Sequence, residues 1–175
     1  MQYRRSFAQG ATYFFTVNLA ERDHDLLIRH IEALRISFRK VRQTHPFEII
    51  AMVVLPEHLH CIWQMPEHDM NYPLRWALIK ANFSRQIPRG ERISDSRKDK
   101  RERGIWQRRY WEHQIKDDLD LKRHVDYIHI NPLKHGYVTR VRDWPYSSFH
   151  RSVKDGLMTL DWAGEIELSD QSYGE

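Results

Sequence analysis

The sequence predicts one α+β domain over residues 1–175 with a ferredoxin-like fold, in which helices cover one face of an antiparallel sheet. One observation is the order of the hydrophobic patterns: strand, helix, strand, strand, helix, strand, and then one added helix towards the C-terminus. The other is length and composition, because 175 residues with six tryptophans are enough to bury one proper core.

The first three elements follow from residue type and spacing. Residues 11–19 are rich in aromatic and β-branched side chains, which is typical of a strand. Apolar residues at helical spacing predict a helix over residues 25–43, capped by Asp23 or Asp25. Residues 47–55 are almost continuously apolar, which predicts a central strand covered on both faces.

Two histidines open the next strand, after a tight Pro-Glu turn. Alternation along a strand puts His58 and His60 on one face and Leu59 and Trp63 on the other. The two histidines are then roughly 7 Å apart at the backbone, which suits imidazoles that converge on one divalent metal ion. A pair of ordinary polar residues at the start of a strand is the alternative.

The second half of the chain continues the alternation. A helix is predicted from Pro73 to just before Pro88. Residues 89–104 form a highly charged loop with a single apolar side chain, Ile93, and the loop is therefore expected to be mobile. Residues 105–115 are interpreted as a strand and residues 117–130 as a helix.

This last helix carries a polar flank with a candidate nucleophile. Steps of about 100° per residue place Asp120, His124, Tyr127 and Asn131 together beside its apolar stripe. Pro132 is expected to stop the helix, so that Asn131 lies at its end. If the helix packs on the histidine face, a metal ion held by two imidazoles can polarise a phosphodiester while the Tyr127 hydroxyl attacks phosphorus.

Clusters of basic residues matter more than the total charge, because the net charge is only +4 and the pI is near 9.2. Three segments mix basic with aromatic residues, the composition of a groove for single-stranded nucleic acid. They are an N-terminal arm over residues 1–10 with Tyr3, Arg4 and Arg5, a middle segment with Trp106, Arg108 and Arg109, and a C-terminal extension over residues 137–175. A frayed terminus is the alternative for the arm, and an edge strand with packed tryptophans is the alternative for the middle segment.

The remaining composition limits the class of protein. The one cysteine, Cys61, excludes an intrachain disulfide and a four-cysteine zinc site. The sequence has no run of 18 apolar residues and no apolar signal core, so we expect a cytoplasmic protein without a membrane partner. The basic face of the first helix is interpreted as a solvated surface. It comprises Arg29, Arg35, Arg39, Lys40 and Arg42.

Four ordered motifs between residues 3 and 149 resemble those of one known family, the REP-associated tyrosine transposases, which belong to the single-tyrosine HUH endonucleases. The motifs are His58-Leu59-His60 after Leu-Pro, Trp106-Gln107 before an aromatic-Glu-His strand, Tyr127-Ile128-His129-Ile130-Asn131-Pro132 with Lys134-His135-Gly136, and Asp143-Trp144-Pro145-Tyr146-Ser147-Ser148. Together they are far more specific than the His-x-His pair alone.

This resemblance implies an enzyme that nicks and joins single-stranded DNA at hairpin-forming repetitive extragenic palindromes. Mg²⁺ or Mn²⁺ assists, and the products are a 5′-phosphotyrosine and a free 3′-hydroxyl. The resemblance also implies that His58 and His60 bind the metal, that Tyr127 is the nucleophile and that Asn131 is a further ligand. Glu57 stands where the family commonly has Asn, so the surroundings of the first histidine are expected to differ.

The resemblance further places contacts to the foot of the hairpin in the N-terminal arm and in the segment from Trp144 to Arg151. The other histidines near the motifs are interpreted as structural or solvent-facing rather than as ligands. They are His113, His124, His129 and His135. Monomer and homodimer both remain open.

Two other functions remain open as well. One is a hairpin DNA-binding protein without catalytic activity. The other is an RNA-binding protein, because one common RNA-binding module also presents aromatic residues on a ferredoxin-like sheet. The presence of His58, His60 and Tyr127 together favours the enzyme, since a protein that only binds has no need of all three.

Overall fold

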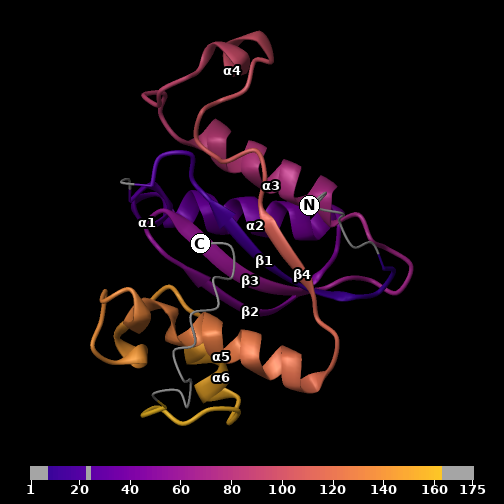
Figure 1. Cartoon of the computed structure of the whole chain (residues 1–175), viewed down its shortest axis with the longest axis vertical. Helices are drawn as coiled ribbons and strands as arrows, with labels where there is room; N and C mark the ends of the chain where they lie inside the picture. Colours follow the sequence, from indigo (N-terminus) through magenta and orange to yellow (C-terminus); the bar gives the residue numbers. More distant parts are fainter. Residues whose placement is uncertain (1–7, 23–24, 163–175) are drawn as a thin grey trace, which may run out of the picture.

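The predicted ferredoxin-like fold is confirmed by the computed structural model, which describes residues 8–22 and 25–162 (Figure 1). Four strands form one antiparallel sheet in the order β2-β3-β1-β4. They are β1 (Thr12–Asn18), β2 (Glu48–Val54), β3 (His58–Gln64) and β4 (Trp111–Gln114). The histidine strand β3 therefore lies inside the sheet, as the topology predicts.

Helices lie on both sides of this sheet (Figure 1). α2 (Ile31–Thr44) and α3 (Tyr72–Gln86) pack together on one face, and the added helix α5 (Asp118–Lys134) contacts β2 and β3 from the other. The shorter helices are α1 (Leu26–Arg29), α4 (Asp95–Asp99), the 3-10 helix η1 (Val141–Asp143) and α6 (Phe149–Lys154). Among the residues that the structure describes, no helix is long and apolar enough to cross a membrane.

The side chains of β3 alternate between two hydrophobic cores. Leu59 and Trp63 are fully buried in the larger core, beneath α2 and α3. Ile62 belongs to the smaller core, beneath α5. His58 and His60 share the face of Ile62, so the predicted alternation is confirmed and both histidines face α5.

The apolar strand β2 lies at an edge of the sheet, so its predicted central position is wrong. Its outer side is covered by residues from the C-terminal part of the chain. The Val54 amide donates to the Tyr146 carbonyl at 2.9 Å, and the Ser148 amide donates to the Met52 carbonyl at 2.8 Å. The Met52 amide in turn donates to the Ser148 hydroxyl at 2.9 Å. The two faces of β2 contribute to both cores, Val54 to the larger and Ala51 and Val53 to the smaller, which explains its apolar composition.

The helix predicted over residues 25–43 is divided into α1 and α2. The break falls at His30, whose backbone leaves the helical region at φ −115° and ψ 37°. Asp25 precedes α1, but its carboxylate pairs with Arg29 at 2.6 Å and makes no side-chain cap. The other candidate cap, Asp23, lies outside the described residues.

The strand predicted over residues 105–115 is shorter than expected, because only Trp111–Gln114 forms β4. Earlier in this segment Trp106 makes an isolated bridge to Leu19, just beyond the end of β1. Residues 108–110 separate the two paired stretches. The segment therefore follows β1 in two short pieces rather than as one strand.

α5 continues past Pro132, which was expected to end it. A proline inside a helix removes one backbone hydrogen bond because it lacks an N–H group. Here the proline lies close to the C-terminus, where the His135 amide donates to the carbonyls of Asn131 and Leu133 and closes the last turn. Gly136 follows with a φ of 72°, a conformation that commonly ends a helix. Asn131 is therefore held by helical backbone on both sides.

The charged segment over residues 89–104 contains α4 and is tied to the end of α3 by one arginine. The Arg103 guanidinium donates to the carbonyls of Ser84 and Ile87, the latter at 2.9 Å. It also forms a two-pronged pair with Glu91, at 2.5 and 2.7 Å. The expected mobility of this segment stays a prediction.

Candidate active site

The two histidines of β3 converge on one point. Their Nε2 atoms are 3.2 Å apart, and the rings of His58 and His60 lie 4.8 Å apart at an angle of 83°. Both side chains are fully buried. The strand periodicity in the sequence predicts the shared face that this convergence requires.

Each histidine is oriented through its Nδ1 atom. The Nδ1–H group of His58 donates to a carboxylate oxygen of Glu57 at 2.8 Å. Nδ1 of His60 shares a hydrogen bond with the hydroxyl of Thr16 at 2.8 Å, and Thr16 lies directly opposite His60 in the register of β1 and β3. Since Nδ1 is engaged in both rings, Nε2 is the atom that each histidine directs at the shared point.

Glu57 is ionised at neutral pH. Burial raises the pKa of its carboxyl, but the hydrogen bond and charge of His58, together with Arg22, outweigh burial and lower the pKa to about 2. The Arg22 guanidinium lies 3.4 Å from one carboxylate oxygen, and the Tyr137 hydroxyl donates to the other at 3.5 Å. A carboxylate behind an imidazole makes its second nitrogen a better metal ligand. Glu57, which was expected to change the surroundings of His58, supplies such a carboxylate behind the His58 ring.

The donor atoms fit a divalent metal ion. Two ligand atoms at roughly 2.1 Å from one ion, at angles between right and tetrahedral, are about 3.0–3.4 Å apart. The 3.2 Å between the two Nε2 atoms lies in this range. Asn131, the expected further ligand, is fully buried on α5, one helical turn after Tyr127. Two imidazole nitrogens and an amide oxygen make a donor set that suits a divalent cation.

Tyr127 lies against the histidine pair. Its ring is 5.3 Å from the ring of His60 at an angle of 71°, and 6.2 Å from that of Phe14. The side chain is only 5% exposed, so α5 holds it between helix and sheet. The Lys134 ammonium, two turns further along α5, donates to the Tyr127 hydroxyl at 3.2 Å and lies 4.9 Å from the ring centre.

A second group of donor atoms connects β4 to α5. His113, Asp120 and His124 place ligand atoms within 4.8 Å of one another, and such a group can hold a metal ion. In the present arrangement Asp120 bonds to His113 at 2.8 Å, and the two imidazole rings stack 4.7 Å apart. Burial lowers the pKa of His124, which favours its neutral form. The group also connects β4 to the helix that carries Tyr127, and the structural interpretation of these histidines stays a prediction.

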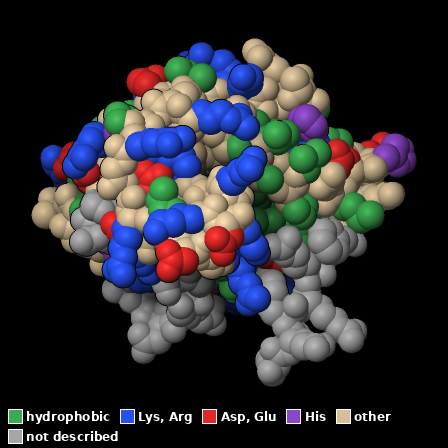
Figure 2. Space-filling model, turned by 90° about the horizontal axis from the view of Figure 1, so that it is seen from above, with side chains coloured by type: hydrophobic (Ala, Val, Ile, Leu, Met, Phe, Trp, Pro, Cys, Tyr) green, Lys and Arg blue, Asp and Glu red, His purple; other side chains and the backbone are tan. Residues whose placement is uncertain are grey.

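The predicted DNA contacts of the middle segment divide into two kinds. Trp106 is 6% exposed and packs against Phe83 at 5.3 Å, so the alternative interpretation, a tryptophan packed in the core, describes it better. Arg108 is paired with Glu102 at 2.8 Å, and Arg109 is exposed. Figure 2 shows Lys and Arg side chains spread over the face of the molecule that carries α4. The two arginines stay predicted DNA contacts.

The predicted contacts of the C-terminal extension lie along β2. The Trp144 indole donates to the Val54 carbonyl at 3.0 Å. The Arg151 guanidinium donates to the carbonyls of Ile49 and Ile50, at 2.9 and 2.6 Å. Both side chains hold the extension to the sheet, and their contact with DNA stays a prediction. The residues of the N-terminal arm, Tyr3, Arg4 and Arg5, lie outside the described residues.

Sequence reasoning missed two members of this site. The partnership of Thr16 with His60 depends on strand register, which no local pattern reveals. Lys134 carries a signal that was overlooked, because residues seven apart share a helix face. A helix extended past Pro132 would have placed it above Tyr127.

Fold and site together define a class of protein, the DNA transposases with a tyrosine beside a histidine pair. The family model described as "Transposase IS200 like" matches residues 11–131, a range that contains the whole sheet, both strand histidines, Tyr127 and Asn131. Within that class, the chain belongs to the REP-associated tyrosine transposases, as the motifs indicate.

Three similar proteins support this family membership. The chain is 47% identical over 174 residues to the REP-associated tyrosine transposase of Escherichia coli K12, covering 99% of this chain and 96% of that protein. It is 48% identical over 167 residues to a Haemophilus influenzae protein of the same family name, covering 95% of each. A solved structure of a REP-associated tyrosine transposase bound to a REP hairpin shares 46% identity, with a TM-score of 0.86 over 100% of this chain and 97% of that one.

Proposed function

We propose that this transposase cleaves and rejoins single-stranded DNA at hairpins of the REP type through a covalent bond to Tyr127. One observation carries the proposal: the Tyr127 ring lies 5.3 Å from His60, whose Nε2 converges with that of His58. A nucleophile and two metal ligands thus share one buried corner between α5 and the sheet. The solved relative, which is bound to a REP hairpin, supports the choice of partner.

We assign His58, His60 and Asn131 as ligands of a Mg²⁺ or Mn²⁺ ion. When bound, such an ion shields the charge of the scissile phosphate and polarises it towards attack. The residues of the chain fix the ligand geometry. Glu57 and Thr16 orient the two imidazoles, and helical backbone on both sides holds Asn131.

In the proposed step, the hydroxyl oxygen of Tyr127 forms a bond to phosphorus, and the bond from phosphorus to the 3′ oxygen of the leaving strand breaks. The phenolic proton leaves to water, and the departing 3′ oxygen takes up a proton. The products are a 5′-phosphotyrosine and a free 3′-hydroxyl. Attack of a 3′-hydroxyl on the phosphotyrosine is the reverse of this step, and it rejoins DNA.

Lys134 has a role in both directions of this reaction. Its ammonium lies 3.2 Å from the Tyr127 oxygen, where negative charge appears when the hydroxyl loses its proton or when the tyrosine leaves phosphorus. A fixed positive charge at that position stabilises the phenolate without further rearrangement. The same contact holds the ring in place above the sheet.

Covalent capture tests the proposal. The protein is incubated with a labelled single-stranded REP-type hairpin from its own genome, with and without Mg²⁺ or Mn²⁺, and the mixture is separated on a denaturing gel. We expect a metal-dependent protein–DNA adduct. Tyr127→Phe should abolish the adduct and leave hairpin binding unchanged, because it removes one oxygen and little packing.

His58→Ala is the companion variant, and it should reduce metal-dependent cleavage much more than hairpin affinity. A metal titration identical to that of the wild type would make the histidine pair structural. Binding without any adduct, across several such hairpins, would favour the hairpin-binding protein without activity.

A further inference from the structure

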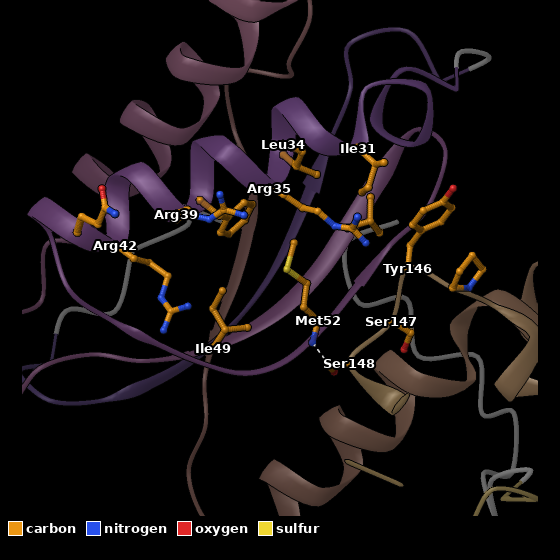
Figure 3. Close-up of a pocket in the computed structure, with 14 residues that line it drawn as sticks. Ile31, Leu34, Arg35, Arg39, Arg42, Ile49, Met52, Tyr146, Ser147 and Ser148 are labelled. Carbon is orange, nitrogen blue, oxygen red and sulfur yellow. Dashed lines mark hydrogen bonds between the residues drawn. The ribbon is translucent and has the colours of Figure 1, made fainter. Parts of the chain in front are cut away.

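A pocket of about 560 Å³ lies at the β2 edge of the sheet, away from the catalytic corner. It is formed by α2, β2 and residues 145–148 of the C-terminal extension. Figure 3 shows Arg35, Arg39 and Arg42 projecting from α2 on one side, with Tyr146 facing them from the extension. Its volume is within the roughly 300–1,000 Å³ that small-ligand sites occupy.

The pocket has an excess of positive charge. Its fourteen lining residues include three arginines and no Asp or Glu. Arg35 pairs with Glu32, and Arg42 donates to the Phe47 carbonyl at 3.1 Å. Arg39 is exposed and makes no ion pair with any residue that the structure describes. A cationic pocket of this kind attracts an anionic ligand.

The other side of the pocket is apolar and partly aromatic. Ile49 and Met52 of β2 lie across the pocket from α2, and their side chains and that of Tyr146 are only half-buried (Figure 3). Guanidinium groups bind phosphate, and an aromatic or apolar surface stacks a base. A free phosphate would leave the apolar surface unused, and an apolar peptide would leave the arginines unused. A nucleotide uses both.

A row of rings connects this pocket to the histidine pair. Tyr146 lies 5.7 Å from Trp144, and Trp144 stacks on Tyr137 at 5.4 Å and 29°. Tyr137 lies 6.1 Å from His135, whose ring is 5.4 Å from that of His58. Each separation is within the roughly 4.5–7 Å of ordinary ring contacts. Tyr137 and His135 are exposed, so this part of the row faces solvent.

We propose that the pocket is a subsite for single-stranded DNA outside the hairpin, and that the row of rings is the path by which this strand leaves the catalytic corner. The inference rests on the proposed function, since it assumes a DNA strand at Tyr127. Bases then stack along the rings, and phosphates meet the arginines of α2.

Binding measurements with two DNAs test this subsite. One probe is the bare REP-type hairpin, and the other is the same hairpin with an oligothymidine extension on each side. Fluorescence anisotropy gives the affinity of both over a series of salt concentrations. The variants are Arg39→Gln and the double variant Arg35→Gln/Arg39→Gln. Lys40→Gln is the matched control, because Lys40 is an exposed cation of the same helix that does not line the pocket.

The wild type should bind the extended hairpin more tightly than the bare one. Arg39→Gln should weaken binding of the extended hairpin roughly three- to ten-fold, and should lower the slope of log K against log salt by about 0.7 for a lost phosphate contact. Binding of the bare hairpin should stay unchanged, and Lys40→Gln should behave as the wild type with both probes.

The outcomes separate this inference from the proposed function. Equal affinity of wild type and double variant for the extended hairpin would overturn the subsite, even if the Tyr127 adduct forms. An equal loss in Lys40→Gln would also overturn it, because general charge would then explain the effect. A loss confined to the arginine variants establishes the subsite, even if no adduct is ever captured.

Discussion

Two side chains behind the histidine pair decide how its ring nitrogens are oriented. Glu57 and Thr16 each bond to an Nδ1 atom, which leaves the Nε2 atoms of His58 and His60 directed at one point. An imidazole with a fixed tautomer and orientation binds metal better than one that must be ordered at binding. The two partners differ, because one is a carboxylate and the other a hydroxyl.

Glu57→Gln tests the carboxylate. Glutamine retains a hydrogen-bond acceptor but has no negative charge, so we expect the metal concentration for half-maximal adduct formation to rise roughly 10- to 100-fold. Activity at saturating metal should largely recover. Adduct formation across a Mn²⁺ titration measures both quantities.

Thr16→Val is the counterpart on His60, and it should also raise the metal requirement, because it removes the hydroxyl that orients the ring. Unfolding by urea provides the control for both variants. An unchanged metal requirement in both, with normal stability, would show that the Nδ1 partners do not act through the metal.

At the scale of residues, the candidate side chains could be predicted from the sequence, but their tertiary contacts could not. The faces on which His58, His60 and Tyr127 lie follow from strand alternation and helical steps. Their assigned roles come from the family resemblance. The pairing of Thr16 with His60 needs the register of two strands that are far apart in the chain. Trp106 was assigned to DNA by composition, and only tertiary packing shows that its ring is buried.

At the scale of elements, the order and type of the helices and strands could be predicted from the sequence. The position of each strand in the sheet and the exact ends of each element could not. Hydrophobicity predicted β2 correctly as a strand, but both a central strand and a covered edge strand are apolar. The cover comes from Tyr146 and Ser148, which have no local pattern that points to β2. α5 passes Pro132 because a late proline removes only one hydrogen bond, which its tertiary contacts outweigh.

The 89–104 segment gives a prediction about one element. The Glu91 carboxylate accepts hydrogen bonds from Arg103. These bonds, and to a smaller extent the charge of Arg103, lower the pKa of Glu91 to about 2 from an ordinary value near 4.5. The folded state therefore favours the carboxylate, and this stabilisation is complete above pH 4.5 and is lost as the pH falls towards 2. At neutral pH it contributes on the order of 1–2 kcal/mol to holding the segment.

Glu91→Gln should therefore speed tryptic cleavage in this arginine- and lysine-rich segment roughly 5- to 30-fold at neutral pH, because the segment opens more often. Asp95→Asn is the matched control, since Asp95 belongs to an exposed pair with Lys98 and should have no effect. Equal cleavage rates for wild type and Glu91→Gln would mean that the pair does not hold the segment. The segment would then be as mobile as its composition predicts.

At the scale of the whole molecule, one chain supplies every assigned member of the site. His60 on β3 and Tyr127 on α5 belong to the same chain, and their rings are 5.3 Å apart. Helices that carry a catalytic residue can exchange between protomers, and each site then combines two chains. The two arrangements differ in what a mixture of inactive variants can do.

A mixture of His60→Ala and Tyr127→Phe should therefore form no DNA adduct. Each chain lacks one member of its own site, and neither can borrow the missing member from the other. Wild type mixed with Tyr127→Phe is the control and should form the adduct. Adduct in the mixture of the two variants would mean that α5 exchanges between protomers, whereas the oligomeric state itself is measured separately by sedimentation.

The cover of β2 also affects how the protein is made. Met52 and Ser148 are 96 positions apart, so their pairing is a contact of high contact order that closes late in folding. Until Ser148 has left the ribosome, the outer side of β2 is an unprotected apolar edge, which can pair with another nascent chain. Residues 146–148 shield this edge in the folded protein, so proteins shortened before Ser148 should depend on chaperones to stay in solution.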